Sequence, residues 1–184
     1  SLIINLNDSE KILQGDICIF HKDWVLDSLS EKGLDCKLYV TDSNRKSKSS
    51  ANFYVTRFFP YTQENKDLIM YRYIKDEMTI EEILFISALK ICEIISNQKR
   101  KTQKVYMIGF DFKLDKDIYS RKIKFDHSLD DKHFKASFIR NQEFYLIQIM
   151  ALVDEEKDKK IDIVHVGKKQ YSKLSYSQFN QLFR

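Results

Sequence analysis

The chain has 184 residues, 43% of them apolar, and its 31 Lys and Arg against 27 Asp and Glu give a net charge of +4. This length and apolar content suffice for one well-buried domain. The small net charge and scattered basic residues argue against nucleic acid as a partner, and no apolar run reaches the roughly 18 to 20 residues that span a bilayer.

Cysteine usage indicates the compartment. Cys18, Cys36 and Cys92 fall inside apolar runs, and none belongs to a CxxC pattern. We therefore predict small buried hydrophobes in a reduced, cytoplasmic protein. The chain begins at Ser1 without methionine, which suggests either a cloning remnant or a domain excised from a longer protein.

The first part of the chain alternates strand and helix patterns. Glycine or proline punctuates several of the predicted ends, as at Gly15, Gly33 and Pro60. The stretch 41–50 is a polar loop. The predicted elements are a strand at 2–6, a short helix at 10–14, a strand at 17–20, a helix at 21–32, a strand at 36–41 and an aromatic strand at 52–59.

The remaining elements follow the same alternation. Thr79 and Glu82 have capping-box spacing, which predicts that a deeply buried helix begins there. VYMIGFDF at 105–112 predicts a central parallel strand covered on both faces. Beyond an irregular segment at 113–132 we predict a helix at 137–153, a strand at 161–166 and a last helix capped by Ser175 and Gln178.

Strands separated by helices of these lengths are typical of a parallel sheet with right-handed crossovers. We predict an α/β fold: a single Rossmann-like domain over residues 1–184, with a mainly parallel sheet flanked by helices.

Ligands of such sheets bind outside the carboxyl ends of the strands. The polar residues at the ends of the predicted strands are Asn7, His21, Lys22, Asp42, Ser43, Asn44, Asp111, His165, Lys168 and Lys169. This set carries both signs of charge and suits a phosphorylated or sugar ligand. The alternative is that loops are polar at the edge of any such sheet, and the sequence leaves both interpretations open.

Common catalytic patterns are absent from the sequence. It has no glycine-rich phosphate loop, no GxSxG and no HExxH. His127 and His133 are spaced so that one helical face cannot hold both, so we expect no metal site. In the irregular segment, Tyr119 is the tyrosine we expect to contact phosphate or sugar.

Several segments carry a family resemblance through their order along the chain. They are LIINLNDSEKI, DICIFHKDWVLDSLSEKGLDCKLYVTDSN, EEILFISALKIC followed by VYMIGFDF, IYSRKIKFD and KIDIVHVG. In this order, over most of the chain, they resemble the Campylobacter-type bacterial sialyltransferases. These Rossmann-like enzymes transfer sialic acid from CMP-sialic acid to a glycan.

The resemblance implies a cytoplasmic enzyme of a bacterial sialic or nonulosonic acid pathway. It would transfer a sugar from a CMP donor to a glycan acceptor with inversion, using no metal or other cofactor. Of the catalytic residues, His133 would deprotonate the acceptor hydroxyl and Asp111 would brace the donor pocket or bind ribose. The residues implied to bind substrate are Asn7, His21, Asn44 and Tyr119.

An alternative stays open. Asp8 and Glu81 stand where the family has small residues near the donor phosphate, and a carboxylate there is unfavourable. The sequence from RNQEFYLIQIMALV onward also looks like a sialyltransferase-like domain that is sometimes fused to sialic-acid synthases. The second hypothesis is therefore a non-catalytic binding or assembly domain of a multidomain sialic-acid biosynthesis enzyme.

Overall fold

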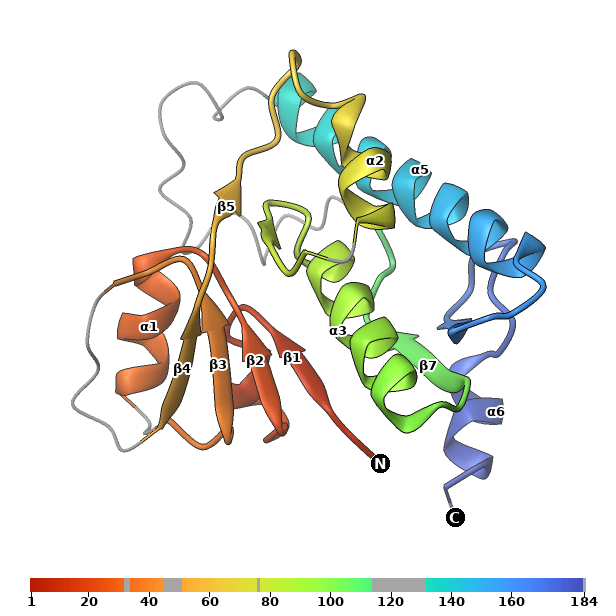
Figure 1. Ribbon diagram of the computed structural model, residues 1–184, viewed down its shortest axis with the longest axis horizontal. Helices are drawn as coiled ribbons and strands as arrows, with labels where there is room; N and C mark the ends of the chain where they lie inside the picture. The colour runs from red at the N-terminus through yellow and green to blue at the C-terminus, as the bar shows by residue number, and fades with distance from the viewer. Residues whose placement is uncertain (32–33, 45–50, 76, 114–131, 184) are drawn as a thin grey trace. The chain divides into compact units, whose positions relative to one another are not determined.

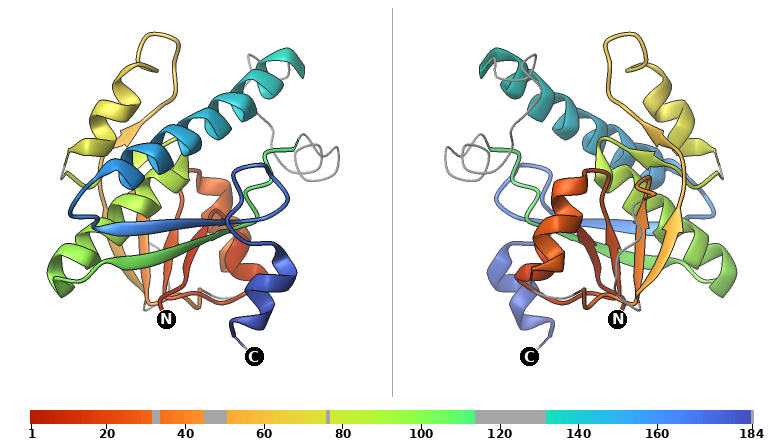
Figure 2. Two further views of the ribbon diagram at one scale, coloured as in Figure 1. Left: turned by 90° about the vertical axis from the view of Figure 1, so that its right-hand side faces the viewer. Right: turned by 90° about the vertical axis from the view of Figure 1, so that its left-hand side faces the viewer.

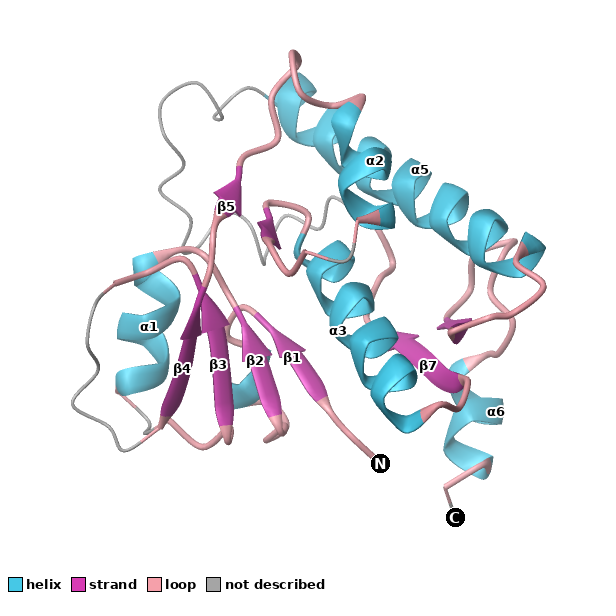
Figure 3. Ribbon diagram, in the orientation of Figure 1, coloured by secondary structure: helices cyan, strands magenta, loops and turns pink. Residues whose placement is uncertain are grey.

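The computed structural model describes residues 1–31, 34–44, 51–75, 77–113 and 132–183 (Figure 1). They form two compact units, Ser1–Ile94 and Ile95–Arg184. Every strand pair in the described part of the chain is parallel, and helices flank the strands (Figure 3). The predicted α/β class with parallel strands is confirmed, whereas the extent of the domain stays a prediction.

A four-stranded parallel sheet forms the first part of unit 1. Its strands follow the order β1-β2-β3-β4, and all four arrows point the same way in Figure 1. Their bounds are β1 (Ile4–Leu6), β2 (Ile17–Ile19), β3 (Leu38–Thr41) and β4 (Asn52–Val55). The 3-10 helix η1 (Ser9–Lys11) follows β1, and the helix α1 (Asp23–Ser30) follows β2.

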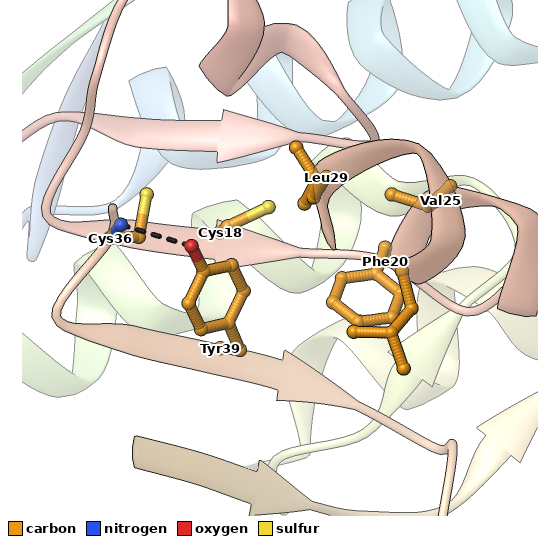
Figure 4. Close-up of a cluster of buried hydrophobic side chains, with 7 residues drawn as sticks. Cys18, Phe20, Val25, Leu29, Cys36 and Tyr39 are labelled. Atoms are coloured by element: carbon orange, nitrogen blue, oxygen red, sulfur yellow. Dashed lines mark hydrogen bonds between the residues drawn. The ribbon is translucent and has the colours of Figure 1, made fainter. Parts of the chain in front are cut away.

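The core of this sheet lies under α1, which crosses one face in the right-hand view of Figure 2. Val25 and Leu29 of α1 pack with Phe20, Cys18 and Tyr39 from the ends and middles of β2 and β3 (Figure 4). All five side chains are buried. Cys18 and Cys36 are free and buried, as predicted, and Cys92 is free and partly buried.

A buried carboxylate fastens η1 to the chain that leads into β3. Glu10 accepts hydrogen bonds from the backbone N–H groups of Asp35 at 2.6 Å and Cys36 at 2.9 Å. The Tyr39 hydroxyl donates to the same carboxylate at 2.8 Å. Three donors replace the water that this buried anion has lost, which is what makes its burial tolerable.

The described residues of the rest of unit 1 form one short parallel pair and two helices. The pair is β5 (Phe58–Phe59) with β6 (Ile80–Glu81), and the helices are α2 (Leu68–Ile74) and α3 (Leu84–Lys99), which runs into unit 2. The predicted aromatic strand at 52–59 is therefore divided into β4 and β5.

The predicted start of the buried helix at Thr79 is wrong, because α3 begins at Leu84. The carboxylate of Glu82 accepts from the N–H of Tyr61 at 2.6 Å, and Thr79 donates to Glu81 at 3.1 Å. The residues that the local pattern assigns to a helix cap thus lie on either side of β6, which pairs with β5 instead of starting a helix.

In the described part of unit 2, one pair of strands and two helices lie wholly within the unit. These elements are β7 (Gln103–Ile108), α5 (Lys132–Glu155), β8 (Ile161–Val166) and α6 (Tyr176–Gln181). β7 and β8 run side by side in the left-hand view of Figure 2. Ser175 and Gln178 form the predicted capping box of α6. Burial of β7 on both faces is not observed, since Ile108 is 49% exposed.

Candidate functional site

The carboxyl ends of β2 and β3 frame a pocket in unit 1. Because β1, β2 and β3 are parallel neighbours, the residues that follow them emerge at one edge of the sheet. The pocket has a volume of about 660 Å³ and is lined by His21, Lys22, Asp23, Asp42, Ser43 and Asn44. Two residues predicted to bind substrate, His21 and Asn44, therefore line one pocket.

His21 is a neutral side chain in this pocket. Its ring stacks on Phe58 with centroids 4.4 Å apart and planes 8° from parallel. Burial, and secondarily the charge of Lys22, lowers the pKa of His21 to about 4. The imidazole is therefore uncharged at neutral pH, and Lys22 is the cation among the described residues that line the pocket.

Two carboxylates, Asp23 and Asp42, line the same pocket. The Ser43 hydroxyl donates to Oδ1 of Asp23 at 2.8 Å, and the N–H of Ser43 donates to the Thr41 hydroxyl at 3.1 Å, which fixes the turn after β3. Asp42 Oδ1 is buried and has no hydrogen-bond partner within the described ranges. Loss of solvent, and then the charge of Asp23, raises the pKa of Asp42.

Asn7 directly follows β1 at the same edge but is not among the residues that line the pocket. It takes a left-handed backbone conformation, φ 53°, which asparagine tolerates better than most residues. Its N–H donates to the carbonyl of Ile19 at 2.9 Å, and its carbonyl accepts from the Cys18 thiol. The next residue, Asp8, accepts from Ser28 of α1 at 3.4 Å.

Glu81 is neutralised inside unit 1. Arg72 of α2 donates to its carboxylate through Nη2 at 2.7 Å and through Nε at 3.0 Å, and both side chains are buried. The carboxylate that we expected to be unfavourable beside the donor phosphate is therefore paired with Arg72. The sequence analysis did not predict this pair, because no local pattern indicated the helix that carries Arg72.

Asp111 belongs to a second polar cluster, which lies at the carboxyl ends of β7 and β8 in unit 2. The Tyr176 hydroxyl of α6 contacts both carboxylate oxygens of Asp111 at 3.1 Å. His165 is fully buried, with Nε2 3.0 Å from the carbonyl of Phe110 and Nδ1 3.0 Å from the Ser172 hydroxyl. The sequence predicted Asp111 and His165 at this edge, but gave no signal for Tyr176 or Ser172.

The contacts of His165 join several parts of this cluster. A carbonyl can only accept, so Nε2 donates to Phe110. Nδ1 lies 3.0 Å from the Ser172 hydroxyl, which also accepts from the N–H of Lys169 at 2.9 Å. His165 thus braces the turn that carries Asp111.

The remaining predicted site residues lie outside this description. Tyr119 falls outside the described residues, and His133 is the second residue of α5 with its side chain also outside them.

In the part of the chain that the structure describes, no three His, Cys, Asp or Glu side chains group as a metal site. None of the described helices is long and apolar enough to cross a membrane.

Comparison with protein-family models, with curated proteins and with solved structures finds no match to this chain.

Proposed function

We propose that the pocket at the ends of β2 and β3 binds the nucleotide of a CMP-sugar donor. The chain would then be a sialyltransferase-like domain of a bacterial sialic or nonulosonic acid pathway. The observation that carries the proposal is the convergence of His21 and Asn44, which come from separate strand ends, on one pocket. The sequence resemblance assigns both residues to the donor site.

The lining offers groups that can bind a phosphate and a sugar. Among the described residues that line it, Lys22 supplies an ammonium for the phosphate, His21 is neutral, and Asp23 and Asp42 are carboxylates. Ser43 and Asn44 offer hydroxyl and amide groups that bind hydroxyls and carbonyls. Pairing of Glu81 with Arg72 also removes one of the two carboxylates that favoured the non-catalytic alternative.

In the proposed reaction, the acceptor hydroxyl oxygen attacks the anomeric carbon of the bound sugar. The bond between that carbon and the phosphate oxygen breaks, and CMP leaves with the electron pair. The sequence resemblance assigns acceptance of the hydroxyl proton to His133. The low pKa of His21 excludes it from this role at neutral pH, since proton transfer favours a base whose pKa lies near the working pH.

Calorimetric titration with CMP, cytidine and CMP-sialic acid tests the donor site. We expect micromolar binding of both phosphorylated ligands, and a loss of about tenfold or more for CMP in Lys22→Ala, because a charge-assisted hydrogen bond to phosphate is removed. Cytidine should bind wild type and variant alike. Lys37→Ala is the matched control, since Lys37 lies before β3 at the opposite end of the strand and pairs with Asp16.

Absence of heat at millimolar CMP would refute the proposal. Binding of CMP-sialic acid without transfer to any glycan acceptor would instead favour the non-catalytic domain.

A further inference from the structure

The helix α5 carries an exposed apolar stripe that has no part in the proposed donor site. Its inner face packs on β8, and α5 lies across the β7 and β8 pair in the left-hand view of Figure 2. Leu146 and Ile149 are fully buried on that face. On the opposite face, Phe144 is 53% exposed and Ile147 is 42% exposed, and the exposed Ala151 follows one turn later. The outward face of a surface helix is normally polar, so this stripe indicates an interaction surface.

The stripe belongs to one continuous side of the helix, which we call the outer face of α5. Its members follow one another at intervals of three or four residues, the spacing of neighbours on one side of a helix. All of them are exposed. From residue 137 to residue 155 this face is about 27 Å long, at a rise of about 1.5 Å per residue. The outer face consists of Ser137, Arg140, Phe144, Ile147, Gln148, Ala151 and Glu155.

The charges of the outer face indicate what covers it. Arg140 lies near its beginning and Glu155 at its end, and neither forms an ion pair within the described residues. In an antiparallel pair of identical helices, a two-fold axis between Ile147 and Gln148 sets each residue level with the one equally far beyond the axis in the other copy. Arg140 of each copy then lies level with Glu155 of the other. Opposite charges therefore meet at both ends of such a pair.

We propose that the outer face of α5 binds the same face of a second copy of this chain, as an antiparallel helix pair about a two-fold axis. The register that joins the charges also sets the bulky Phe144 against the small Ala151 of the second copy, which lets the helices approach closely. Two faces of this length bury on the order of 1,000 Å², the lower end for a specific interface, so we expect a reversible dimer with a micromolar Kd.

Sedimentation velocity over a concentration series from about 1 μM to about 1 mM tests the dimer. Wild type should show an equilibrium between monomer and dimer. Arg140→Glu and Glu155→Arg should each weaken it about tenfold or more, because each turns two attractive contacts of the dimer into repulsive ones. The matched control is Lys104→Glu, an exposed charge reversal in β7 with the same change of net charge as Arg140→Glu, and it should leave association unchanged.

Recombining the reversed charges gives the sharpest measurement. A mixture of Arg140→Glu with Glu155→Arg should form a heterodimer with about the affinity of wild type, since both of its charge contacts are attractive again. The double variant with both changes should likewise associate as wild type does. Phe144→Ala should weaken association about tenfold to a hundredfold, because one aromatic ring is lost from each copy. Ile12→Ala, which shortens an exposed apolar side chain of unit 1, should not change it.

The outcomes decide the proposal. All these positions are exposed, so each variant should melt within a few degrees of wild type, which checks that it is folded. A chain that is monomeric at the highest concentration would overturn the proposal, and so would a dimer that none of the outer-face changes weakens. Two weakened charge variants whose mixture does not associate would show that Arg140 does not face Glu155, which overturns the antiparallel pairing.

Discussion

His21 shows how one residue couples a pocket to stability. Its pKa is about 4 in the folded chain and near 6.5 when it is exposed. Between these values the unfolded chain binds the proton more readily, so the free energy of unfolding falls as the pH drops from about 6.5 towards 4. A pKa difference of this size corresponds to at most about 3 kcal/mol.

Urea unfolding between pH 7.5 and 4 measures this dependence. We expect His21→Phe, which keeps a ring stacked on Phe58 but cannot titrate, to lose less stability than wild type over that range. Above pH 7 the difference in free energy of unfolding between the two proteins should no longer change with pH. Parallel pH profiles for the two proteins would show that the ring of His21 is not buried in the folded chain.

At the scale of elements, the ion pair between Arg72 and Glu81 joins α2 to β6. Glu81→Gln leaves the Arg72 guanidinium buried beside a neutral amide, and breaking a buried pair from one side costs about 3 to 5 kcal/mol. Denaturant unfolding should show this loss, whereas Glu64→Gln at an exposed position should change stability by less than about 0.5 kcal/mol. The double change Arg72→Met with Glu81→Leu should recover most of it. A small effect of Glu81→Gln alone would mean that water reaches the pair.

The two capping-box patterns explain which elements the sequence can predict. Ser175 and Gln178 form their box through contacts between residues three apart in the chain. Thr79 and Glu82 have the same spacing, but β5 pairs with β6 and the N–H of Tyr61 takes the Glu82 carboxylate. A local sequence pattern predicts the structure correctly where the hydrogen-bond partners are close in the chain. It fails where a strand distant in the chain provides a competing partner.

The candidate site likewise has features that the sequence predicts and features that it does not. The positions of His21 and Asn44 follow from the rule that parallel strands end at one edge, so the sequence predicts that they meet. The stack of His21 on Phe58 and the donation of Tyr176 to Asp111 join residues far apart in the chain. Such contacts depend on loop paths and side-chain rotamers, which composition and periodicity do not specify.

At the scale of the whole chain, α3 belongs to both compact units. In its first half, the Ser87 hydroxyl accepts from the N–H of Glu81 at 2.8 Å, and Lys90 donates to the Thr79 hydroxyl at 3.3 Å, all within unit 1. Near its end, the Ser96 hydroxyl contacts the carbonyls of Lys101 and Lys160 in unit 2. One continuous helix is thus held at both ends by side-chain contacts.

This sharing predicts cooperative unfolding, because a break in α3 would expose backbone groups of either unit. The lone tryptophan, Trp24, reports on unit 1, while far-UV circular dichroism reports on the helices of both. Ser96→Ala removes a buried hydroxyl of unit 2 and should cost about 1 to 3 kcal/mol. We expect the fluorescence and dichroism midpoints to move together by the same amount, and Ser137→Ala at an exposed position of α5 to move neither. A dichroism shift with an unmoved Trp24 signal would show instead that the two units unfold independently, despite the helix they share.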